Sequence, residues 1–178
     1  MKVLIIVDMQ NDFITGALGT PEAVSAKENI VNKICNMNEV EVENTFIFFT
    51  RDTHYENYMD TLEGKMLPIL HCQFETDGWE IDSDIAVAAD DFAQIVFDKI
   101  TFGSTGLLEE LEERKDTIDE IEICGVCTDI CVISNALPIR MLFPNMKITV
   151  DSTCCAGVTP EKHEAALEVM RSCQIEVV

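Results

Sequence analysis

Short apolar runs alternate with segments of helical spacing along this chain of 178 residues. The first run, residues 2–7, is a continuous aliphatic stretch of the kind that is buried on both faces of a parallel sheet. Parallel neighbours need long crossover connections, and a helix is the usual crossover. The alternation therefore predicts an α/β protein of three layers, with helices on both faces of a central, mostly parallel sheet. The predicted strands are residues 2–7, 45–50, 94–97, 120–124, 147–150 and 174–178.

Four longer segments have helical spacing: residues 21–38, 104–115, about 129–142 and 160–172. Pro138 lies inside the third of them and should kink the helix or remove one of its hydrogen bonds. No Pro/Gly/Ser-rich linker or repeat divides the chain, so we expect residues 1–178 to form a single domain.

The segment of residues 52–91, between the second and third predicted strands, is longer than a loop that only connects two strands. It carries two of the three histidines in the chain. We therefore expect this excursion to form a lid that carries part of a metal site.

The chain is strongly acidic, with a formal net charge of -21 from 12 basic and 33 acidic residues. This charge argues against nucleic acid or an anionic membrane as a partner. The apolar run at the start is too short for a signal peptide or a membrane span and ends at Asp8. The eight cysteines are scattered over segments expected to be buried, which favours reduced thiols and a cytoplasmic protein.

The segment GVCTDICV, residues 125–132, places a thiol where a buried strand passes into a helix. Thr128 and Asp129 read as the helix start, which puts Cys131 in the first helical turn. Free N–H groups and the helix dipole favour the thiolate there, so we expect a lowered pKa and a reactive sulfur. Cys131 is therefore a candidate nucleophile.

Two charged residues end other predicted strands. Asp8 follows the first strand and Lys99 follows the third. Ligands of parallel sheets gather at the carboxyl ends of the strands, so both side chains and Cys131 are expected in one crevice. Taken singly, an aspartate after a strand is often a cap, a lysine is often solvated, and a buried cysteine is often a small hydrophobe. Their joint order and placement favour a catalytic group.

Three motifs together carry a family resemblance: VDMQNDF at residues 7–13, FDK at 97–99 and GVCTDICV at 125–132. In these motifs the chain resembles the isochorismatase-like cysteine hydrolases and, within them, the nicotinamidase-type amidases. The resemblance runs from the first predicted strand to the last and implies the isochorismatase-like, Rossmann-like αβα fold. It also implies hydrolysis of a small, nicotinamide-like amide to the acid and ammonia through a thioester, by an enzyme that is a homo-oligomer.

The resemblance assigns roles to individual residues. Cys131 would attack, Asp8 would act as general base and then as acid, and Lys99 would balance the charge. A non-proline cis peptide bond would precede residue 127, so that the N–H groups of Cys127 and Cys131 form an oxyanion hole. Cys127 itself departs from the family, which usually has a small residue such as alanine there. Its thiol is either inert packing or a resolving partner for an oxidised Cys131.

A second constellation follows the strand 45–50 and combines imidazole and carboxylate groups, which suits zinc, iron or manganese. Alternation along the chain points the side chains of Asp52 and His54 the same way, as a shared ion requires. The other reading is that these groups hydrogen-bond a turn. Nicotinamidases resemble this pattern too: Asp52, His54 and His71 match their ligands directly, and Glu63 matches the variant with glutamate in place of the middle histidine. A divalent metal is therefore expected, with zinc as the first choice.

Phe13 and Phe102 follow the strands that end in Asp8 and Lys99, so an aromatic ring could lie between them; apolar packing is the competing reading. Nicotinamidases often have tryptophan where this chain has Pro68, and the single tryptophan is Trp79. A carbamoyl or ureido substrate is therefore a second hypothesis.

A different class of function is a thiol-based zinc or redox module, since residues 124 and 127 have CxxC spacing but no second such pair exists. Its candidate thiols are Cys124, Cys127, Cys131, Cys154 and Cys155.

Overall fold

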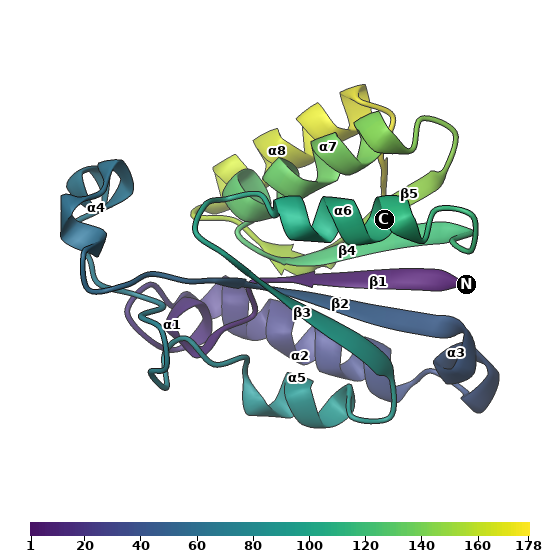
Figure 1. The fold of residues 1–178 in the computed structure, drawn as a ribbon, viewed down its shortest axis with the longest axis horizontal. Coiled ribbons are helices and arrows are strands. Elements are labelled where there is room, and N and C mark those ends of the chain that lie inside the picture. The colour runs from purple at the N-terminus through teal and green to yellow at the C-terminus, as the bar shows by residue number, and fades with distance from the viewer.

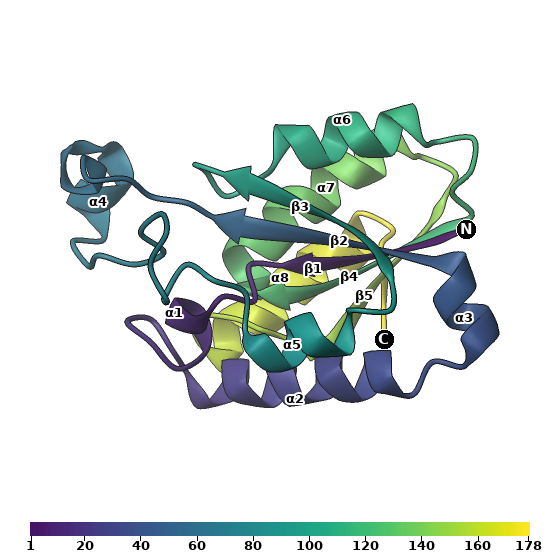
Figure 2. The same ribbon diagram turned by 60° about the horizontal axis from the view of Figure 1, so that its bottom comes forward.

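The computed structural model describes residues 1–178, and its six strands form one sheet in the order β3-β2-β1-β4-β5-β6. Every strand pair is parallel, so the sheet predicted to be mostly parallel is entirely so. Figure 2 shows the strands side by side with helices in front of and behind them. The strands are β1 (Lys2–Val7), β2 (Thr45–Asp52), β3 (Ala93–Lys99), β4 (Glu120–Val126), β5 (Lys147–Ala156) and β6 (Glu176–Val177).

Helices cover both faces of the sheet and confirm the predicted three layers (Figure 1). One face carries α2 (Pro21–Cys35) and α5 (Ser83–Ala88), which make the crossovers between the first three strands. The other face carries α6 (Thr105–Glu113), α7 (Ile133–Leu142) and α8 (Pro160–Ser172). None of the helices combines the length and the apolar character that crossing a bilayer requires.

The core lies around the central strand β1, whose residues Val3 to Val7 are completely buried. A strand with a parallel neighbour on each edge and helices on each face has no polar surroundings, which explains its unbroken aliphatic run. Local signals start two of the long helices. Thr20 and Thr159 each accept a hydrogen bond from the first turn of α2 and α8, and a proline follows each of them.

The predicted helix 21–38 is too long. The chain ends α2 at Cys35 and starts a second helix, α3 (Glu39–Asn44), from Asn38. Asn38 and Glu41 form a reciprocal capping box, in which each side chain accepts from the backbone of the other residue. That local signal breaks the helix where apolar spacing alone would let it continue.

Four strands extend beyond their predicted ends toward the carboxyl edge: β2 to Asp52, β3 to Lys99, β4 to Val126 and β5 to Ala156. The pairing of Asp52 with Lys99 between β2 and β3 shows that polar residues continue the ladder. The predicted strands ended where the apolar run becomes polar, but the hydrogen bonds between neighbouring strands continue past that point.

The predicted helix 129–142 is also different in detail. It begins with a wide turn, η2 (Thr128–Val132), in which the N–H of Val132 donates to the carbonyl of Cys127, five residues earlier. The regular helix α7 starts only at Ile133 and contains Pro138. Such wide turns often occur at functional sites.

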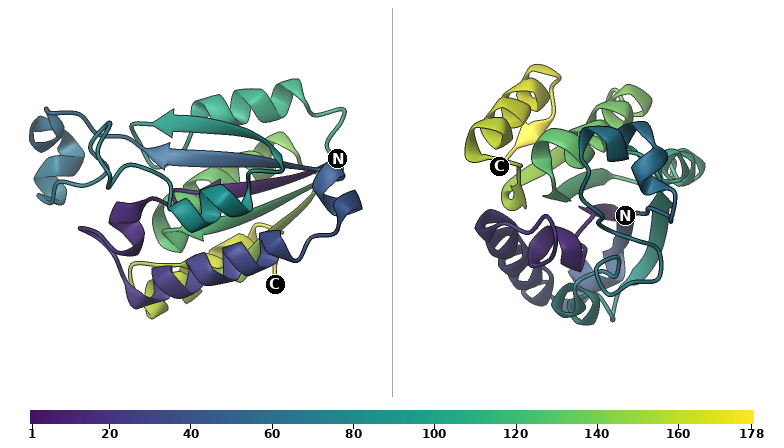
Figure 3. Two further views of the ribbon diagram at one scale, coloured as in Figure 1. Left: turned by 90° about the horizontal axis from the view of Figure 1, so that it is seen from below. Right: turned by 90° about the vertical axis from the view of Figure 1, so that its left-hand side faces the viewer.

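The excursion between β2 and β3 contains the short helices η1 (Tyr58–Asp60) and α4 (Leu62–Met66) before α5. Figure 1 and the left view of Figure 3 show α4 beyond the carboxyl ends of the strands, away from the main body. The right view of Figure 3 looks onto this edge, with the excursion in front of the sheet. The excursion therefore lies beside the edge where parallel sheets bind ligands.

Candidate active site

Asp8 is the first residue after β1 and its side chain is completely buried. Its φ angle of 49° lies in the left-handed region, which non-glycine residues rarely adopt and which is typical of functional sites. The N–H of Asp8 donates to the carbonyl of Thr50 (3.1 Å), and the Thr50 hydroxyl donates to Asp8 Oδ1 (2.6 Å). The backbone and the carboxylate of Asp8 are thus both held by β2.

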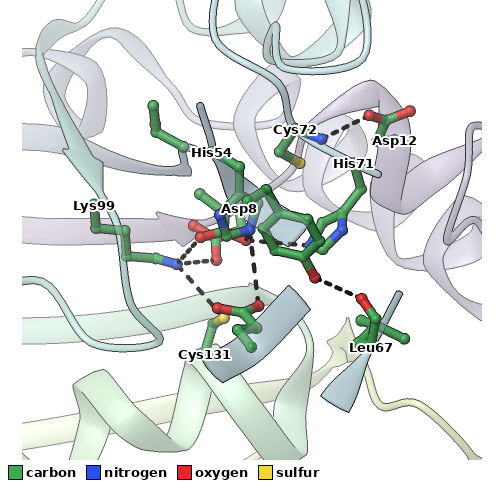
Figure 4. Close-up of polar contacts among 12 residues, drawn as sticks. Asp8, Asp12, His54, Leu67, His71, Cys72, Lys99 and Cys131 are labelled. Atoms are coloured by element: carbon green, nitrogen blue, oxygen red, sulfur yellow. Dashed lines mark hydrogen bonds and ion pairs between the residues drawn. The ribbon is translucent and has the colours of Figure 1, made fainter. Parts of the chain in front are cut away.

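Lys99 and Cys131 reach the same carboxylate from other elements. Lys99, the last residue of β3, places Nζ 2.7 Å from Asp8 Oδ2 and 3.5 Å from Cys131 Sγ. Cys131 lies in η2, after β4. Figure 4 shows the three side chains pointing toward one another. The structure therefore brings the three residues singled out by the motifs into contact distance.

Burial controls the protonation of this group. It raises the pKa of Asp8, although Lys99 acts in the opposite direction. Burial alone would lower the pKa of Lys99, but Asp8, then Cys131 and Asp52, outweigh it and raise that pKa. Burial and then Asp8 raise the pKa of Cys131 well above its usual range. The lowered thiol pKa expected from the helix start is therefore wrong, because desolvation exceeds the effect of the turn's N–H groups. Cys131 rests as a thiol and needs a base.

The Thr50 hydroxyl gives a test of Asp8 as that base. It lowers the pKa of Asp8 by hydrogen-bonding the carboxylate, and a hydrogen bond to a charged group contributes about 1.5–3 kcal/mol. In Thr50→Val the pKa of Asp8 should rise further, so activity that needs ionised Asp8 should appear only at higher pH. We expect the acid limb of the kcat/KM profile to move to higher pH.

The matched control for this prediction is Thr50→Ser, which keeps a hydroxyl and should keep the acid limb near its original pH. Superimposable profiles for Thr50→Val and wild type would contradict a role for Asp8 ionisation in that limb.

The turn before Cys131 has an unpaired backbone donor. The peptide bond between Val126 and Cys127 is cis, as the family resemblance implies. The carbonyl of Cys127 accepts from the N–H groups of Ile130 and Val132 (both 3.0 Å), whereas its own N–H donates to no protein acceptor. The half-buried Cys127 thiol has its pKa raised to about 12 by burial and then by Asp129. A thiol that stays protonated near neutral pH is a poor resolving partner, which favours the packing role.

A second group lies beside the first: the ligand atoms of Asp52, His54, Glu63 and His71 all lie within 4.8 Å of one another. His54 Nε2 lies 3.0 Å from Asp52 Oδ2 and 3.7 Å from Glu63 Oε1. His71 Nε2 lies 3.6 Å from Asp52 Oδ2. Asp52 ends β2, Glu63 is on α4, and both histidines are in the excursion's loops.

The chemistry of this cluster fits a divalent ion. Asp52 Oδ1 and His54 Nε2 are buried and make no hydrogen bond, which is costly unless a further partner is present. Two imidazole nitrogens and two carboxylate groups are a usual ligand set for zinc, manganese or iron. His71 Nδ1 lies 2.8 Å from the carbonyl of Ile69, so its Nε2 is the nitrogen that faces the cluster.

Lys99 joins the two groups. Its Nζ lies 3.5 Å from Asp52 Oδ1, in addition to its contact with Asp8. Burial would raise the pKa of Asp52, but the adjacent imidazoles of His54 and His71 and the charge of Lys99 lower it. Burial and then Asp52 raise the pKa of Glu63. Their surroundings thus shift the pKa values of the two carboxyl groups in opposite directions.

Two buried residues of this region were given no role from the sequence. Gln10 clamps Asp52: its amide nitrogen donates to the carbonyls of Asp52 (2.9 Å) and Trp79 (2.8 Å), and its oxygen accepts from the N–H of Asp52 (2.7 Å). Tyr58 lies with its ring 4.4 Å from that of His54 and donates its hydroxyl to Leu67 (2.8 Å). Gln10 lies within the motif VDMQNDF, so its position was a signal, whereas nothing in the irregular excursion pointed to Tyr58.

The two phenylalanines predicted to bind substrate, Phe13 and Phe102, lie in different surroundings. Phe13 packs edge-on against the ring of His71, with centroids 5.5 Å apart, and Phe102 is 42% exposed. Trp79 is buried under the Arg51 guanidinium, 3.6 Å from the ring centroid, and donates Nε1–H to Thr53 (2.9 Å). The single tryptophan is therefore engaged in packing.

The thiol-based zinc module is contradicted by the arrangement of the cysteines. All eight are free thiols, and the Asp52 cluster is the only group of three or more potential ligands close enough to hold an ion. Cys124, Cys154 and Cys155 are buried apolar residues of β4 and β5. All three pack in the hydrophobic core.

Known proteins are similar to this chain over nearly its whole length. The Isochorismatase domain family matches residues 2–178. The nicotinamidase/pyrazinamidase of Mycobacterium tuberculosis is 28% identical over 197 residues, covering 100% of this chain and 98% of that protein. The structure of a Pyrococcus horikoshii pyrazinamidase in complex with zinc is 30% identical, with a TM-score of 0.77 and coverage of 99% and 98%. That of a Streptococcus mutans pyrazinamidase/nicotinamidase is 25% identical, with a TM-score of 0.84 and coverage of 100% of both chains.

Proposed function

The chain belongs to the isochorismatase family and is a hydrolase of amide C–N bonds, and we propose that it uses Cys131 as the nucleophile to convert a small, nicotinamide-like amide to the acid and ammonia. The observation that carries this proposal is the contact of Lys99 Nζ with both Asp8 Oδ2 (2.7 Å) and Cys131 Sγ (3.5 Å). A thiol, a carboxylate and an ammonium in one buried group provide a nucleophile, a base and a counter-charge.

Acylation begins with proton transfer. The raised pKa of Cys131 keeps the thiol protonated, and Asp8, ionised beside Lys99, takes the proton as sulfur attacks the amide carbon. The new C–S bond converts the carbonyl to a tetrahedral oxyanion. Collapse of this intermediate breaks the C–N bond, and the nitrogen leaves as ammonia with the proton held by Asp8. A thioester on Cys131 remains.

The oxyanion needs donors, and the N–H groups of Cys127 and Cys131 are proposed to supply them. The N–H of Cys127 is available because it donates to no acceptor within the protein. Backbone donors fixed before the reaction are among the largest sources of transition-state stabilisation, about 2.7–4 kcal/mol for one donor.

Deacylation reverses the roles. Asp8, ionised again after ammonia has left, takes a proton from a water molecule that attacks the thioester carbon. The C–S bond breaks, the carboxylic acid leaves, and the proton on Asp8 returns to the sulfur of Cys131. Lys99 favours the ionised form of Asp8 between proton transfers, because its charge lowers the pKa of Asp8 that burial raises.

Asp52, His54, Glu63 and His71 would hold a divalent ion, with zinc the first choice and iron or manganese as alternatives. When bound, such an ion supplies a Lewis acid beside the reacting group. The unpaired Asp52 Oδ1 and His54 Nε2 support this assignment, as does the zinc complex of the P. horikoshii relative.

Removal of the ion should weaken the enzyme strongly. A Lewis acid contributes several kcal/mol, so dialysis against a strong chelator should lower kcat/KM by about a hundredfold. Adding back zinc, manganese or iron should restore activity and identify the effective ion. Metal content by mass spectrometry should fall in parallel with activity. An enzyme freed of its metal that keeps full kcat/KM would contradict a catalytic role for the ion.

We propose that the substrate lies beside Phe13 and Phe102, which flank the Asp8 and Lys99 ends of the site in sequence. A ring of the nicotinamide type would suit the edge of Phe13 against His71. The second candidate is an N-carbamoyl or ureido amide, favoured by Pro68 in the place of the tryptophan usual in nicotinamidases.

The test is ammonia release from a panel of nicotinamide, pyrazinamide, carbamoyl amino acids and ureido compounds. Turnover of nicotinamide or pyrazinamide with kcat/KM above about 10⁴ M⁻¹s⁻¹ would support the first candidate, since that is the lower range for natural substrates. Preference for carbamoyl or ureido compounds would support the second. If wild type with its metal turns over no member of the panel, the proposed substrate class is wrong.

The cellular setting is also a proposal. Eight free thiols suit the reducing cytoplasm, and a charge of -21 suits a small-molecule substrate and no nucleic-acid or membrane partner. We propose that residues 52–91 act as a lid that carries Glu63 and His71, and that the enzyme is a homo-oligomer. Gel filtration with light scattering would test the oligomeric state.

A further inference from the structure

The turn η2 carries the proposed nucleophile, and different groups hold its two ends. At the end near Cys131, Asn135 donates to the carbonyl of Cys131 (2.8 Å) and the N–H of Ile133 donates to the carbonyls of Thr128 and Ile130. At its start no side chain of the N-cap residue Cys127 forms a cap, and the carbonyl of Cys127 accepts from the N–H groups of Ile130 and Val132. Wide turns of this kind are less regular than an α-helix. The position of Cys131 Sγ therefore also depends on the contacts that hold the start of η2.

Two contacts from a distant part of the chain hold it. Thr128, completely buried at the start of η2, has its Oγ1 2.8 Å from Nδ1 of His163 on α8. Asp129, the next residue, accepts a hydrogen bond from the N–H of Val158 (2.9 Å). The loop before α8 and the first turn of α8 thus contact the first two residues of η2.

Gly157 permits this close approach. A Cβ atom at position 157 would lie 2.9 Å from Asp129 Oδ1 and 2.9 Å from Cβ of His163. Any other residue would push α8 away from η2. The loop before α8 is therefore shaped to bring His163 onto the nucleophile turn.

Small displacements of a nucleophile have large effects on rate. A shift of about 1 Å costs about a hundredfold in activity, because reacting atoms must meet in a narrow range of distance and angle. Cys131 must face Asp8 and Lys99 at the same time as the N–H of Cys127 faces the substrate oxygen. Both Cys127 and Cys131 belong to the segment that Thr128 anchors.

We propose that His163 is a positioning residue: its hydrogen bond to Thr128 fixes η2 and so aligns Cys131 for attack. His163 touches neither Asp8 nor Lys99 and lies outside all three sequence motifs. The inference rests on the proposed role of Cys131 as the nucleophile. It predicts that His163 controls kcat more than KM.

The test compares His163→Ala, His163→Asn, Thr128→Val and the Thr128→Val/His163→Ala double variant, with Glu164→Ala as an exposed control on the same helix. With the best amide of the panel, His163→Ala should lower kcat by about tenfold to a hundredfold and change KM by less than about threefold. Asparagine can replace Nδ1, so His163→Asn should recover most of the loss. The double variant should be no worse than the poorer single variant, since both remove one hydrogen bond.

A second readout separates positioning from general loss of stability. Iodoacetamide labelling, quantified for each cysteine by peptide mass spectrometry, should become faster at Cys131 in His163→Ala as its turn loosens. The buried thiols Cys72, Cys124 and Cys154 should label as in wild type. Faster labelling of all buried thiols together would show a structural role only and overturn the proposal.

Kinetics of His163→Ala equal to those of Glu164→Ala, with unchanged labelling, would also overturn the proposal. If wild type hydrolyses no amide, the proposed function fails. The labelling of Cys131 still decides whether His163 holds the turn.

Discussion

Replacement of Cys131 by alanine should reduce kcat/KM for the amide substrate by about 10⁴-fold or more, as is typical when a covalent nucleophile is removed. The remaining groups can polarise the carbonyl but cannot form the C–S bond. Cys131→Ser should be nearly as poor, because the buried Asp8 would have to remove a proton from an alcohol far less acidic than a thiol. Initial rates of ammonia release over a range of substrate concentrations would measure both variants.

The controls for Cys131 are Cys35→Ala and Cys173→Ala, which remove the two exposed thiols. Both should retain wild-type kinetics, since neither lies at the site. Metal content and the unfolding midpoint of Cys131→Ala should match wild type, because the sulfur is not among the metal ligands. Retention of more than about a tenth of wild-type kcat/KM by Cys131→Ala would rule out the covalent mechanism.

Gly125→Ala should destabilise the protein by about 3 kcal/mol or more and abolish activity. Gly125 has φ 115°, and a Cβ there would lie 2.1 Å from the carbonyl oxygen of Val7 and 2.7 Å from its nitrogen. Val7 pairs with Gly125 across β1 and β4, directly before Asp8. The methyl group would have to separate two central strands, in addition to the cost of about 1–3 kcal/mol for an alanine in that conformation. Urea unfolding followed by circular dichroism would measure the loss.

Gly106→Ala is the matched control for Gly125→Ala. Gly106 lies on α6, where an added Cβ would meet only the ring of Phe97 at an ordinary 3.5 Å. Alanine in a helix is about 1 kcal/mol more favourable than glycine, so this variant should be as stable as wild type or more so. A Gly125→Ala protein with the stability and kinetics of Gly106→Ala would show that β1 and β4 can move apart without effect.

Apolar periodicity was sufficient to predict the sheet, the long helices α2, α6, α7 and α8 and the edge at which the site would form, whereas the short crossover helix α5 inside the excursion was not predicted. The aliphatic run of β1 and the capped helix α8 are local patterns, and their bounds follow from them. Ends of elements were less predictable. The continuation of β2 to Asp52 depends on pairing with β3, a partner far along the chain.

The site was predictable where motifs mark strand ends, as at Asp8, Lys99 and Cys131. Its electrostatics were not. The pKa of Cys131 depends on complete burial and on the charge of Asp8, which only the packed structure reveals. Tyr58 and His163 act on the site from an irregular segment and from a late helix, and neither has a local pattern that would indicate such a contact.

The position of the three central groups has a consequence for folding. Asp8 follows the middle strand, Lys99 ends an outer strand on one side, and Cys131 follows the neighbouring strand on the other side. A sheet that lacks β1, β3 or β4 lacks one of the three groups, so a chain folded only to that point has no complete catalytic group. Hydrolysis by this protein is therefore a reporter of the pairing of β3, β2, β1 and β4, and a refolding chain will be catalytically silent until these strands have joined.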